Sequence, residues 1–225
     1  MRSFSAVFWD MDGTLVDSEP LWSIATFEMS ERLGRRLTPE LRERTIGGSF
    51  RNTIAIAAEH AGVKLNEQLI ADNYRFTVER MQELFATRLT LNPGARELLE
   101  ALRAEGVPMV LVTNTPREIA AGSIRAIGED FFVHTVCGDE VPAGKPSPEP
   151  YLHAARLLGV DPSTCVAFED SATGMRSAAD AGCITIGLPE SDEVAVPAGV
   201  RTLQQLHGSR TWVGVTPAEI EKWVV

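Results

Sequence analysis

Two acids lie two residues apart near the start of the sequence, in the stretch Asp10-Met11-Asp12-Gly13-Thr14. The preceding residues 4–9 are apolar and β-favouring apart from two small residues, and they predict a buried strand. Asp10 and Asp12 therefore follow the carboxyl end of a strand, the edge at which open α/β sheets bind ligands. Two carboxylates this close repel each other unless a cation or a proton intervenes, so the pattern indicates a divalent-metal site.

Polar groups also follow three other predicted strands. They are Thr113 and Asn114 after residues 109–112, Lys145 in the loop after residues 133–137, and Glu169 and Asp170 after residues 165–168. Parallel strands present all their carboxyl ends at one edge of a sheet, so these groups can converge. Carboxylates that hold Mg²⁺, with a hydroxyl and an ammonium that orient phosphoryl oxygens, are the set that phosphoryl transfer requires.

Each of these groups has a simpler explanation when it is taken alone. Lys145 fits a solvated loop, Thr113 fits a strand residue that bonds to backbone, and the Glu169-Asp170 pair fits a helix cap. The pair Asp10 and Asp12 is more specific, because a cap or a turn explains one acid and not both. The occurrence of all four groups at strand ends favours the functional interpretation.

The alternation of strands and helices predicts an α/β fold, a doubly wound parallel-sheet (Rossmann-like) core. Strands are expected at residues 4–9, 109–112, 133–137, 165–168, 184–186 and 200–203, and Ser147 is expected to cap the helix that ends at residue 158. Roughly 75 residues with four helical patterns separate the first strand from the next core helix, far more than a crossover needs. We therefore expect an inserted α-helical cap domain at residues 16–90, with the core formed by residues 1–15 and 91–225.

The composition excludes several classes of function. The net charge is −10 and the sequence pI is about 4.9, which argues against nucleic-acid or anionic-membrane partners. The three cysteines are widely spaced and form no CxxC motif, which favours a reducing compartment. No apolar run approaches the ~18 residues of a membrane span, and the N-terminus has no signal-peptide pattern. We expect a cytoplasmic protein.

The sequence resembles the haloacid-dehalogenase-like (HAD) phosphohydrolase superfamily over essentially its whole length. Four segments look like the motifs of that family, in order: Asp10-Met11-Asp12-Gly13-Thr14, Val112-Thr113-Asn114, Gly144-Lys145-Pro146 and Phe168-Glu169-Asp170-Ser171. The insertion after the first motif is similar to the small helical cap of the branch that contains β-phosphoglucomutase and the sugar-phosphate phosphatases.

The resemblance implies a role for each motif residue. Asp10 would attack phosphorus and form an aspartyl-phosphate, while Asp12 would protonate the leaving alcohol and then activate water. Thr113, the backbone amide of Asn114, and Lys145 would hold the phosphoryl group. The implied cofactor is Mg²⁺, with ligands from the Asp10 side chain, the Asp12 main-chain carbonyl and Asp170, and with Glu169 either behind these ligands or bound directly.

Candidate substrate-binding residues in the cap are Glu19, Trp22, Gly48 and Arg51. Gly48 lies in a Gly-Gly loop that can approach a ligand closely, and a plain turn fits it equally well. Trp22 fits either a sugar-stacking role or the cap core. Arg51 could meet a second anionic group, although an exposed helix start also explains it.

The function expected from these residues is Mg-dependent hydrolysis of a small phosphate monoester, a sugar or polyol phosphate. The first alternative is a phosphomutase of the β-phosphoglucomutase type, but mutases of that branch typically carry a histidine where this chain has Trp22. A dehalogenase would not need Asp12. The alternative of another class is a non-enzymatic, receiver-like phospho-acceptor, which lacks an inserted helical domain. We expect a monomer that binds a small-molecule phosphate ester, with no nucleic-acid or membrane partner.

Overall fold

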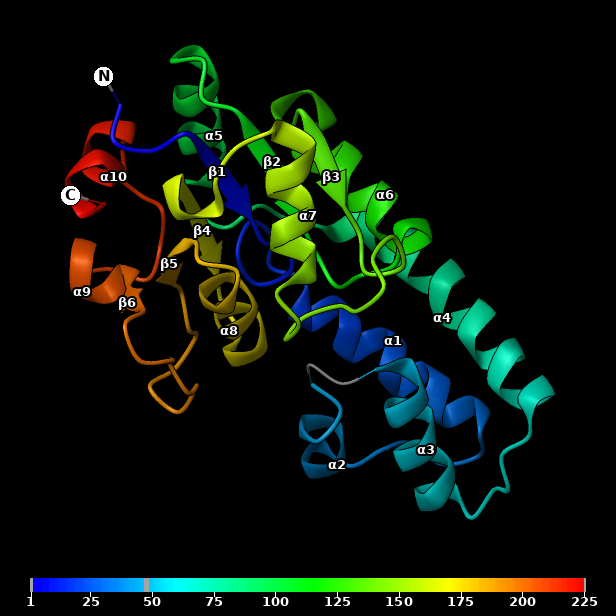
Figure 1. Cartoon of the computed structure of the whole chain (residues 1–225). Helices are drawn as coiled ribbons and strands as arrows, with labels where there is room; N and C mark the ends of the chain where they lie inside the picture. Colours follow the sequence, from blue (N-terminus) through cyan, green and yellow to red (C-terminus); the bar gives the residue numbers. More distant parts are fainter. Residues whose placement is uncertain (1, 47–48, 225) are drawn as a thin grey trace. The chain divides into compact units, whose positions relative to one another are not determined.

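The computed structural model describes residues 2–46 and 49–224. These residues form two compact units, one made of the described residues up to 17 and from 90 onward, and the other made of the described residues between 18 and 89. The strands are β1 (Ala6–Trp9), β2 (Met109–Val112), β3 (His134–Val136), β4 (Cys165–Glu169), β5 (Ile184–Gly187) and β6 (Arg201–Thr202). The helices are α1 (Glu19–Arg32), α2 (Pro39–Glu43), α3 (Phe50–Ala61), α4 (Glu67–Arg88), α5 (Ala95–Ala104), α6 (Arg117–Ile127), α7 (Glu149–Leu158), α8 (Ala172–Asp180), α9 (Leu203–His207) and α10 (Pro217–Trp223). Figure 1 shows these elements in chain order.

The first unit contains a six-stranded parallel sheet, which confirms the predicted doubly wound α/β core. Its strand order is β3-β2-β1-β4-β5-β6. The chain builds outward from β1 to β3 on one side and from β4 to β6 on the other, so the order reverses between β1 and β4. In doubly wound sheets, ligands bind at this reversal, beyond the carboxyl ends of the strands.

The alternating side chains of the buried strands form two hydrophobic layers, one on each face of the sheet. On one face, Phe8 and Val110 belong to a buried cluster that also contains Tyr151 of α7 and Ala178 of α8. On the other face, Trp9, Phe168 and Trp212 pack their rings together, with centroids 4.7–5.2 Å apart. Because this strand is buried on both faces, nearly all of residues 4–9 are hydrophobic, rather than every second one.

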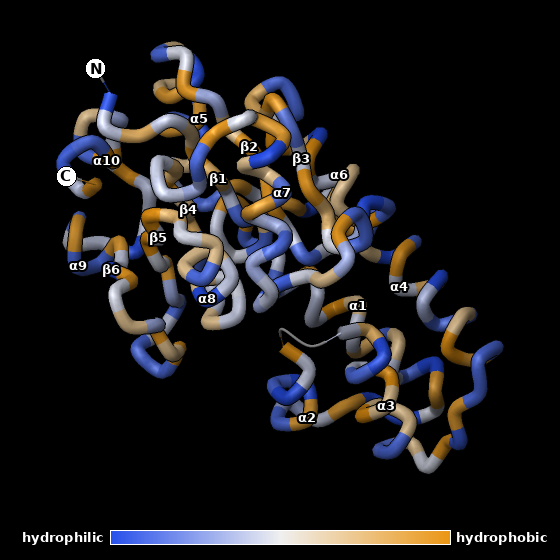
Figure 2. Tube along the Cα trace, viewed as in Figure 1, coloured by the Kyte–Doolittle hydropathy of each residue, from blue (hydrophilic) through white to orange (hydrophobic). Residues whose placement is uncertain are grey.

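The second unit consists of α1–α4 and has a hydrophobic core of its own, formed by Met29, Leu33, Leu37, Ile54, Ala57 and Ala58. Helix α4 spans 22 residues and alternates between hydrophobic and hydrophilic residues along its length (Figure 2). Ion pairing of Arg80 with Glu28, at 2.6 Å, links α4 to α1. Among the residues described, no helix combines the length and the hydrophobicity needed to cross a lipid bilayer.

Two local predictions differ from the structure in detail. The predicted strand at residues 200–203 is only Arg201–Thr202, because a capping box between Thr202 and Gln205 starts α9 at Leu203. The first residue outside α7 is Pro148 rather than the predicted cap Ser147. The Ser147 hydroxyl instead accepts a weak hydrogen bond of 3.3 Å from the amide of Glu149.

Gly94 tests the packing of the first unit, because it precedes α5 with φ +83° and its backbone touches another segment. A Cβ at Gly94 would lie 2.4 Å from the carbonyl carbon of Trp212. We expect Gly94→Ala to lower the free energy of unfolding by more than about 2 kcal/mol, measured by urea denaturation. The control is Gly106→Ala, where φ is +68° and no atom lies within 4 Å of the added Cβ. That variant should lose only about 1 kcal/mol, and equal losses would contradict the packing argument.

The three cysteines provide a pH-dependent test of the core. Burial raises the pKa of Cys137 and Cys183 to about 12 and that of Cys165 to about 11. Since the thiolate is the reactive form, we expect iodoacetamide at pH 8 to alkylate none of the three in the folded protein and all three after denaturation, as measured by intact mass. Rapid native alkylation would show that the core is open.

The same thiols should make stability depend on pH. They ionise at a lower pH in the unfolded chain than in the folded protein, so the free energy of unfolding should fall as the pH rises above about 9.

Candidate active site

The register of the two central strands brings the first and fourth motifs together. Trp9 of β1 lies beside Phe168 of β4, and the amide of Asp10 donates to the carbonyl of Phe168 at 3.1 Å. Asp10 and Glu169 are the next residues on these neighbouring strands. Both are buried, with 6% and 0% of their surface exposed. Two acids 159 positions apart in the sequence therefore share one pocket because their strands pair in this register.

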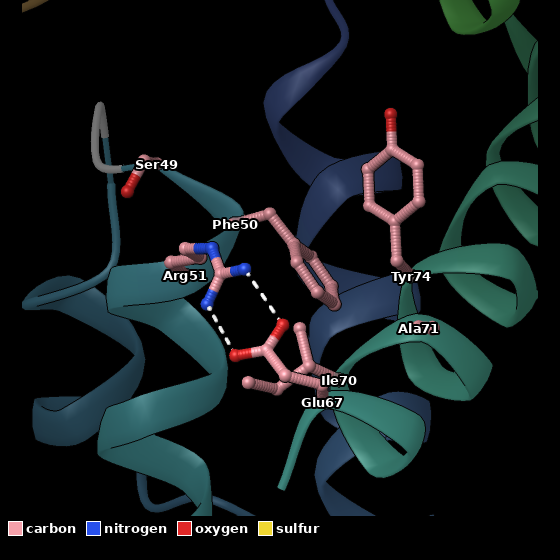
Figure 3. A pocket seen from close by; sticks show the side chains of 7 residues that line it. All are labelled: Ser49, Phe50, Arg51, Glu67, Ile70, Ala71 and Tyr74. Carbon is pink, nitrogen blue, oxygen red and sulfur yellow. Dashed lines mark hydrogen bonds and ion pairs between the residues drawn. The ribbon is translucent and has the colours of Figure 1, made fainter.

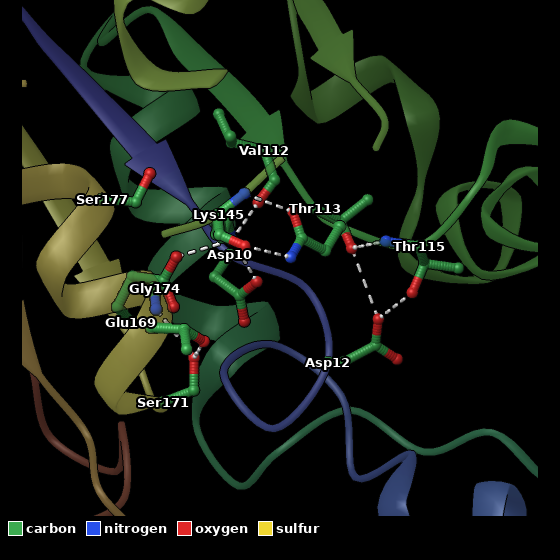
Figure 4. Close-up of polar contacts among 12 residues, drawn as sticks. Asp10, Asp12, Val112, Thr113, Thr115, Lys145, Glu169, Ser171, Gly174 and Ser177 are labelled. Atoms are coloured by element: carbon green, nitrogen blue, oxygen red, sulfur yellow. Dashed lines mark hydrogen bonds and ion pairs between the residues drawn. The ribbon is translucent and has the colours of Figure 1, made fainter. Parts of the chain in front are cut away.

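Lys145 lies between these acids and joins them. Its Nζ is 2.7 Å from Oδ1 of Asp10, 2.5 Å from Oε1 of Glu169 and 2.8 Å from the carbonyl oxygen of Val112 (Figure 4). The Lys145 side chain is only 3% exposed, so the solvated-loop explanation is wrong. A buried ammonium of this kind is held by its carboxylate partners.

The loop that carries Lys145 is held by the side chain of Asn114. Asn114 Oδ1 accepts from the Lys145 amide at 2.8 Å, and Asn114 Nδ2 donates to the Lys145 carbonyl at 3.1 Å. Gly144 leaves room for this contact, since a Cβ there would lie 2.7 Å from Asn114 Oδ1. Gly138 lies against the backbone of the same residue, where a Cβ would lie 2.1 Å from the Asn114 carbonyl oxygen. The side chain of Asn114 thus positions Lys145, a contact that the sequence did not predict.

Asp12 lies apart from this group and has different partners. The Thr115 hydroxyl donates to Asp12 Oδ2 at 2.7 Å, and the Thr113 hydroxyl is 3.4 Å from the same oxygen. Thr113 Oγ1 in turn accepts from the amide of Thr115 at 3.0 Å. Figure 4 shows Asp12 directed toward these threonines and away from Lys145. The two acids of the first motif therefore have separate surroundings, as two chemical roles would require.

Asp10, Glu169 and Asp170 form a cluster in which one carboxylate oxygen from each lies within 4.8 Å of the others. Oδ2 of Asp10 and Oε2 of Glu169 are buried and have no hydrogen-bond partner of ordinary geometry among the described residues. Three carboxylates (−3) and the Lys145 ammonium (+1) leave a formal charge of −2 here. Hard oxygen ligands with this charge fit a cation such as Mg²⁺. The Asp12 side chain is not in this cluster, so of Asp12 only the main-chain carbonyl stays a predicted ligand.

The pKa values of the four charged groups in the pocket are shifted by burial and by the charges of their neighbours. Burial raises the pKa of Asp10, although Lys145 acts in the opposite direction. Burial likewise raises the pKa of Glu169 to about 7, and burial together with the Asp10 charge raises that of Asp170 well above its usual value. Burial alone would lower the pKa of Lys145, but Asp10 and Glu169 outweigh it and raise the value, which keeps the ammonium charged. The raised pKa values of the three carboxyls show that their negative charges are not fully compensated within the protein, and a divalent cation would supply that compensation.

Three residues of this site were given no role in it by the prediction from sequence: Thr115, Gly13 and Tyr151. Thr115 lies two positions beyond Thr113, a spacing that could have identified it. Gly13, with φ +82°, was named only as a member of the first motif, yet a Cβ there would lie 2.0 Å from Asp170 Oδ2. Tyr151 donates from its hydroxyl to Glu169 Oε1, and no local pattern distinguishes it from an ordinary core residue of α7.

Three of the predicted cap residues, Glu19, Trp22 and Arg51, lie in the second unit, and each has a different partner. Glu19 pairs with the buried Arg42 at 2.5 Å, and the Trp22 ring packs edge-on against Phe85, with centroids 6.3 Å apart. Arg51 pairs with Glu67 at 3.0 Å beside a hollow (Figure 3). That hollow is lined by Ser49, Phe50, Arg51, Glu67, Ile70, Ala71 and Tyr74. The predicted residue Gly48 lies outside the described residues.

Comparisons with known proteins agree with this geometry. A sequence profile of the haloacid dehalogenase-like hydrolases matches residues 4–182. A phosphorylated carbohydrates phosphatase of Thermotoga maritima is 36% identical over 179 residues, which cover 79% of this chain and 81% of that protein. A phosphoglycolate phosphatase of Chromobacterium violaceum is 32% identical over 214 residues, covering 92% and 96%. The profile and these two phosphatases confirm the resemblance that the four motifs indicated.

A solved structure shares the fold over almost the whole chain. The crystal structure of a CbbY mutant from Rhodobacter sphaeroides in complex with xylulose-(1,5)bisphosphate superposes with a TM-score of 0.82 at 29% identity. The match covers 96% of this chain and 98% of that one. The architecture described above is therefore that of a known group of hydrolases.

Gly13 tests whether the three-carboxylate cluster binds a cation. Because a Cβ at residue 13 would displace the Asp170 carboxylate, we expect Gly13→Ala to weaken Mg²⁺ binding at least about tenfold, measured by isothermal titration calorimetry. Gly106→Ala, which also has a positive φ and meets no atom, should bind Mg²⁺ like the wild type. Unchanged affinity in Gly13→Ala would mean that Asp170 does not hold the cation.

Proposed function

The chain belongs to the haloacid dehalogenase-like hydrolases and is a phosphoric monoester hydrolase, and we propose that it hydrolyses a sugar or polyol phosphate through an aspartyl-phosphate on Asp10 with Mg²⁺ bound. The observation that carries this proposal is the pocket formed by Asp10, Glu169, Asp170 and Lys145, with its net formal charge of −2. A cation and a phosphoryl group are the pair of ligands that such a pocket suits.

In the first step a carboxylate oxygen of Asp10 attacks phosphorus, and the bond from phosphorus to the ester oxygen breaks. Asp12 gives its proton to the departing alkoxide, which leaves as the alcohol. In the second step Asp12 takes a proton from water as the water oxygen attacks the aspartyl-phosphate, releasing inorganic phosphate and restoring Asp10. The hydrogen bond from Thr115 supports this role, because it orients the Asp12 carboxyl away from the acidic cluster.

The residues present fit Mg²⁺. We propose that Asp10, Asp170 and the main-chain carbonyl of Asp12 hold it, with Glu169 in contact through its unpaired oxygen or behind these ligands. When bound, Mg²⁺ supplies positive charge that offsets the phosphoryl oxygens during transfer. Lys145, Thr113 and the amide of Asn114 would contact the same oxygens, and the raised pKa of Lys145 keeps it charged for that purpose.

We propose that the second unit selects the substrate, through Glu19, Trp22, Gly48 and Arg51. Glu19 suits hydroxyl groups of a sugar or polyol, because a carboxylate accepts hydrogen bonds and repels a second anion. Its side chain pairs with Arg42 and is 42% exposed, so solvent reaches it. We propose phosphorylated carbohydrates and phosphoglycolate as the first candidate substrates, because the names of two relatives mention them. Monomeric state and cytoplasmic location stay predictions.

Two alternative functions were considered, a receiver-like phospho-acceptor and a phosphomutase. The family match sets aside the receiver-like phospho-acceptor, since the chain is a hydrolase. A phosphomutase shares the core residues and differs in the fate of the phosphoryl group. We favour hydrolysis because Trp22 occupies the position at which the related mutases typically carry a histidine.

The decisive measurement is phosphate release from hexose, pentose and hexitol monophosphates and phosphoglycolate. We expect release that requires Mg²⁺, stops with EDTA and falls at least about a thousandfold in Asp10→Asn, which loses the nucleophile. Asp192→Asn is the matched control, because the Asp192 side chain is 97% exposed and should leave the rate unchanged. Conversion of a hexose 1-phosphate to its 6-phosphate without phosphate release would overturn the proposal in favour of a mutase.

A further inference from the structure

Every N–H donor of the Lys145 ammonium already faces an oxygen of the protein. A lysine ammonium has three donors, and the three oxygens around it belong to Asp10, Glu169 and Val112, at 2.5–2.8 Å. To bind a phosphoryl oxygen, Lys145 must release one of them. The Val112 carbonyl is fixed in the sheet, and Asp10 has to remain near the reacting phosphorus. The Glu169 carboxylate is therefore the partner to be released.

The free energy needed to separate Glu169 from Lys145 depends on which other hydrogen-bond partners Glu169 keeps. Glu169 is 0% exposed, and its Oε2 has no hydrogen-bond partner among the described residues. Its Oε1 receives two groups, the Lys145 ammonium and the Tyr151 hydroxyl. A buried carboxylate without a donor is strongly unfavourable, so Glu169 can give up Lys145 only if Tyr151 stays bonded to it.

Packing in the core of the first unit holds Tyr151 beside Glu169. The tyrosine lies on α7, is fully buried, and packs its ring near that of Phe8, with centroids 6.2 Å apart. The Lys145 Nζ also lies 5.4 Å from the centre of the Tyr151 ring. The tyrosine thus contacts both members of the Lys145–Glu169 pair.

We infer that Tyr151 is a positioning residue for phosphate binding: its hydroxyl keeps Glu169 hydrogen-bonded while Lys145 turns one donor from Glu169 to the phosphoryl group. The inference rests on the proposed function, in which Lys145 contacts the phosphoryl group. Without the hydroxyl, Lys145 is the sole donor to Glu169 Oε1 among the contacts described, and it is held there more firmly. Phosphate then has to compete with Glu169 for the ammonium.

The test is Tyr151→Phe, which keeps the ring and removes only the hydroxyl. With Mg²⁺ saturating, we expect the dissociation constant for inorganic phosphate to rise at least about tenfold by isothermal titration calorimetry. The KM for a substrate should rise by a similar factor. The affinity for Mg²⁺ in the absence of phosphate should change less than about twofold, because Asp10 and Asp170 are untouched.

Phe8→Leu is the control for packing, because Phe8 shares the buried cluster with Tyr151 and forms no polar contact through its side chain. It should lower the melting temperature and leave phosphate binding within about twofold of the wild type. The inference is overturned if Tyr151→Phe binds phosphate normally, if both variants weaken phosphate equally, or if Tyr151→Phe weakens only Mg²⁺ binding. Failure of the proposed function would appear separately, as absence of turnover by the wild type.

Discussion

The ion pairs between the buried Lys145 ammonium and the carboxylates of Asp10 and Glu169 are the interactions on which the rest of this site depends. Removing such charges from water costs several kcal/mol for each ion, and their attraction repays this only when the geometry is good and other hydrogen bonds complete it. Here Val112 and Tyr151 provide those hydrogen bonds. The arrangement still carries surplus negative charge, because Asp170 adds a third carboxylate. That surplus prepares the pocket for a cation and a phosphoryl group together.

The parallel sheet makes these contacts possible. Reversal of strand order between β1 and β4 places two acidic strand ends side by side, and β2 adds the carbonyl of Val112 and the side chain of Asn114. Buried strands on both sides of the reversal hold the carboxyl ends rigidly, while the loops beyond them carry the reactive groups. The same arrangement explains the role of glycine at residue 13, because only a residue without a Cβ lets the first loop approach Asp170.

Prediction from the sequence was most successful where a signal is local. The apolar strand at residues 4–9, the paired acids that follow it and the polar ends of the other strands all follow from side-chain type and spacing. It failed where two local signals compete, as at Thr202, whose capping box with Gln205 starts a helix in place of a longer strand. It also missed Tyr151, because a tyrosine on the apolar face of a helix looks the same whether or not its hydroxyl has a buried partner.

The sequence by itself determined the elements and the inventory of reactive groups, since hydrophobic periodicity and turn residues act over a few positions. Only the tertiary structure decided which oxygen each group faces. Lys145 meets Asp10 across 135 positions, and Thr115 meets Asp12 across 103. Those pairings depend on strand order and register, and these are set by the packing of the whole sheet. That is why Asp12 could be predicted to act as an acid, while its hydrogen bond to Thr115 and its separation from the carboxylate cluster could not.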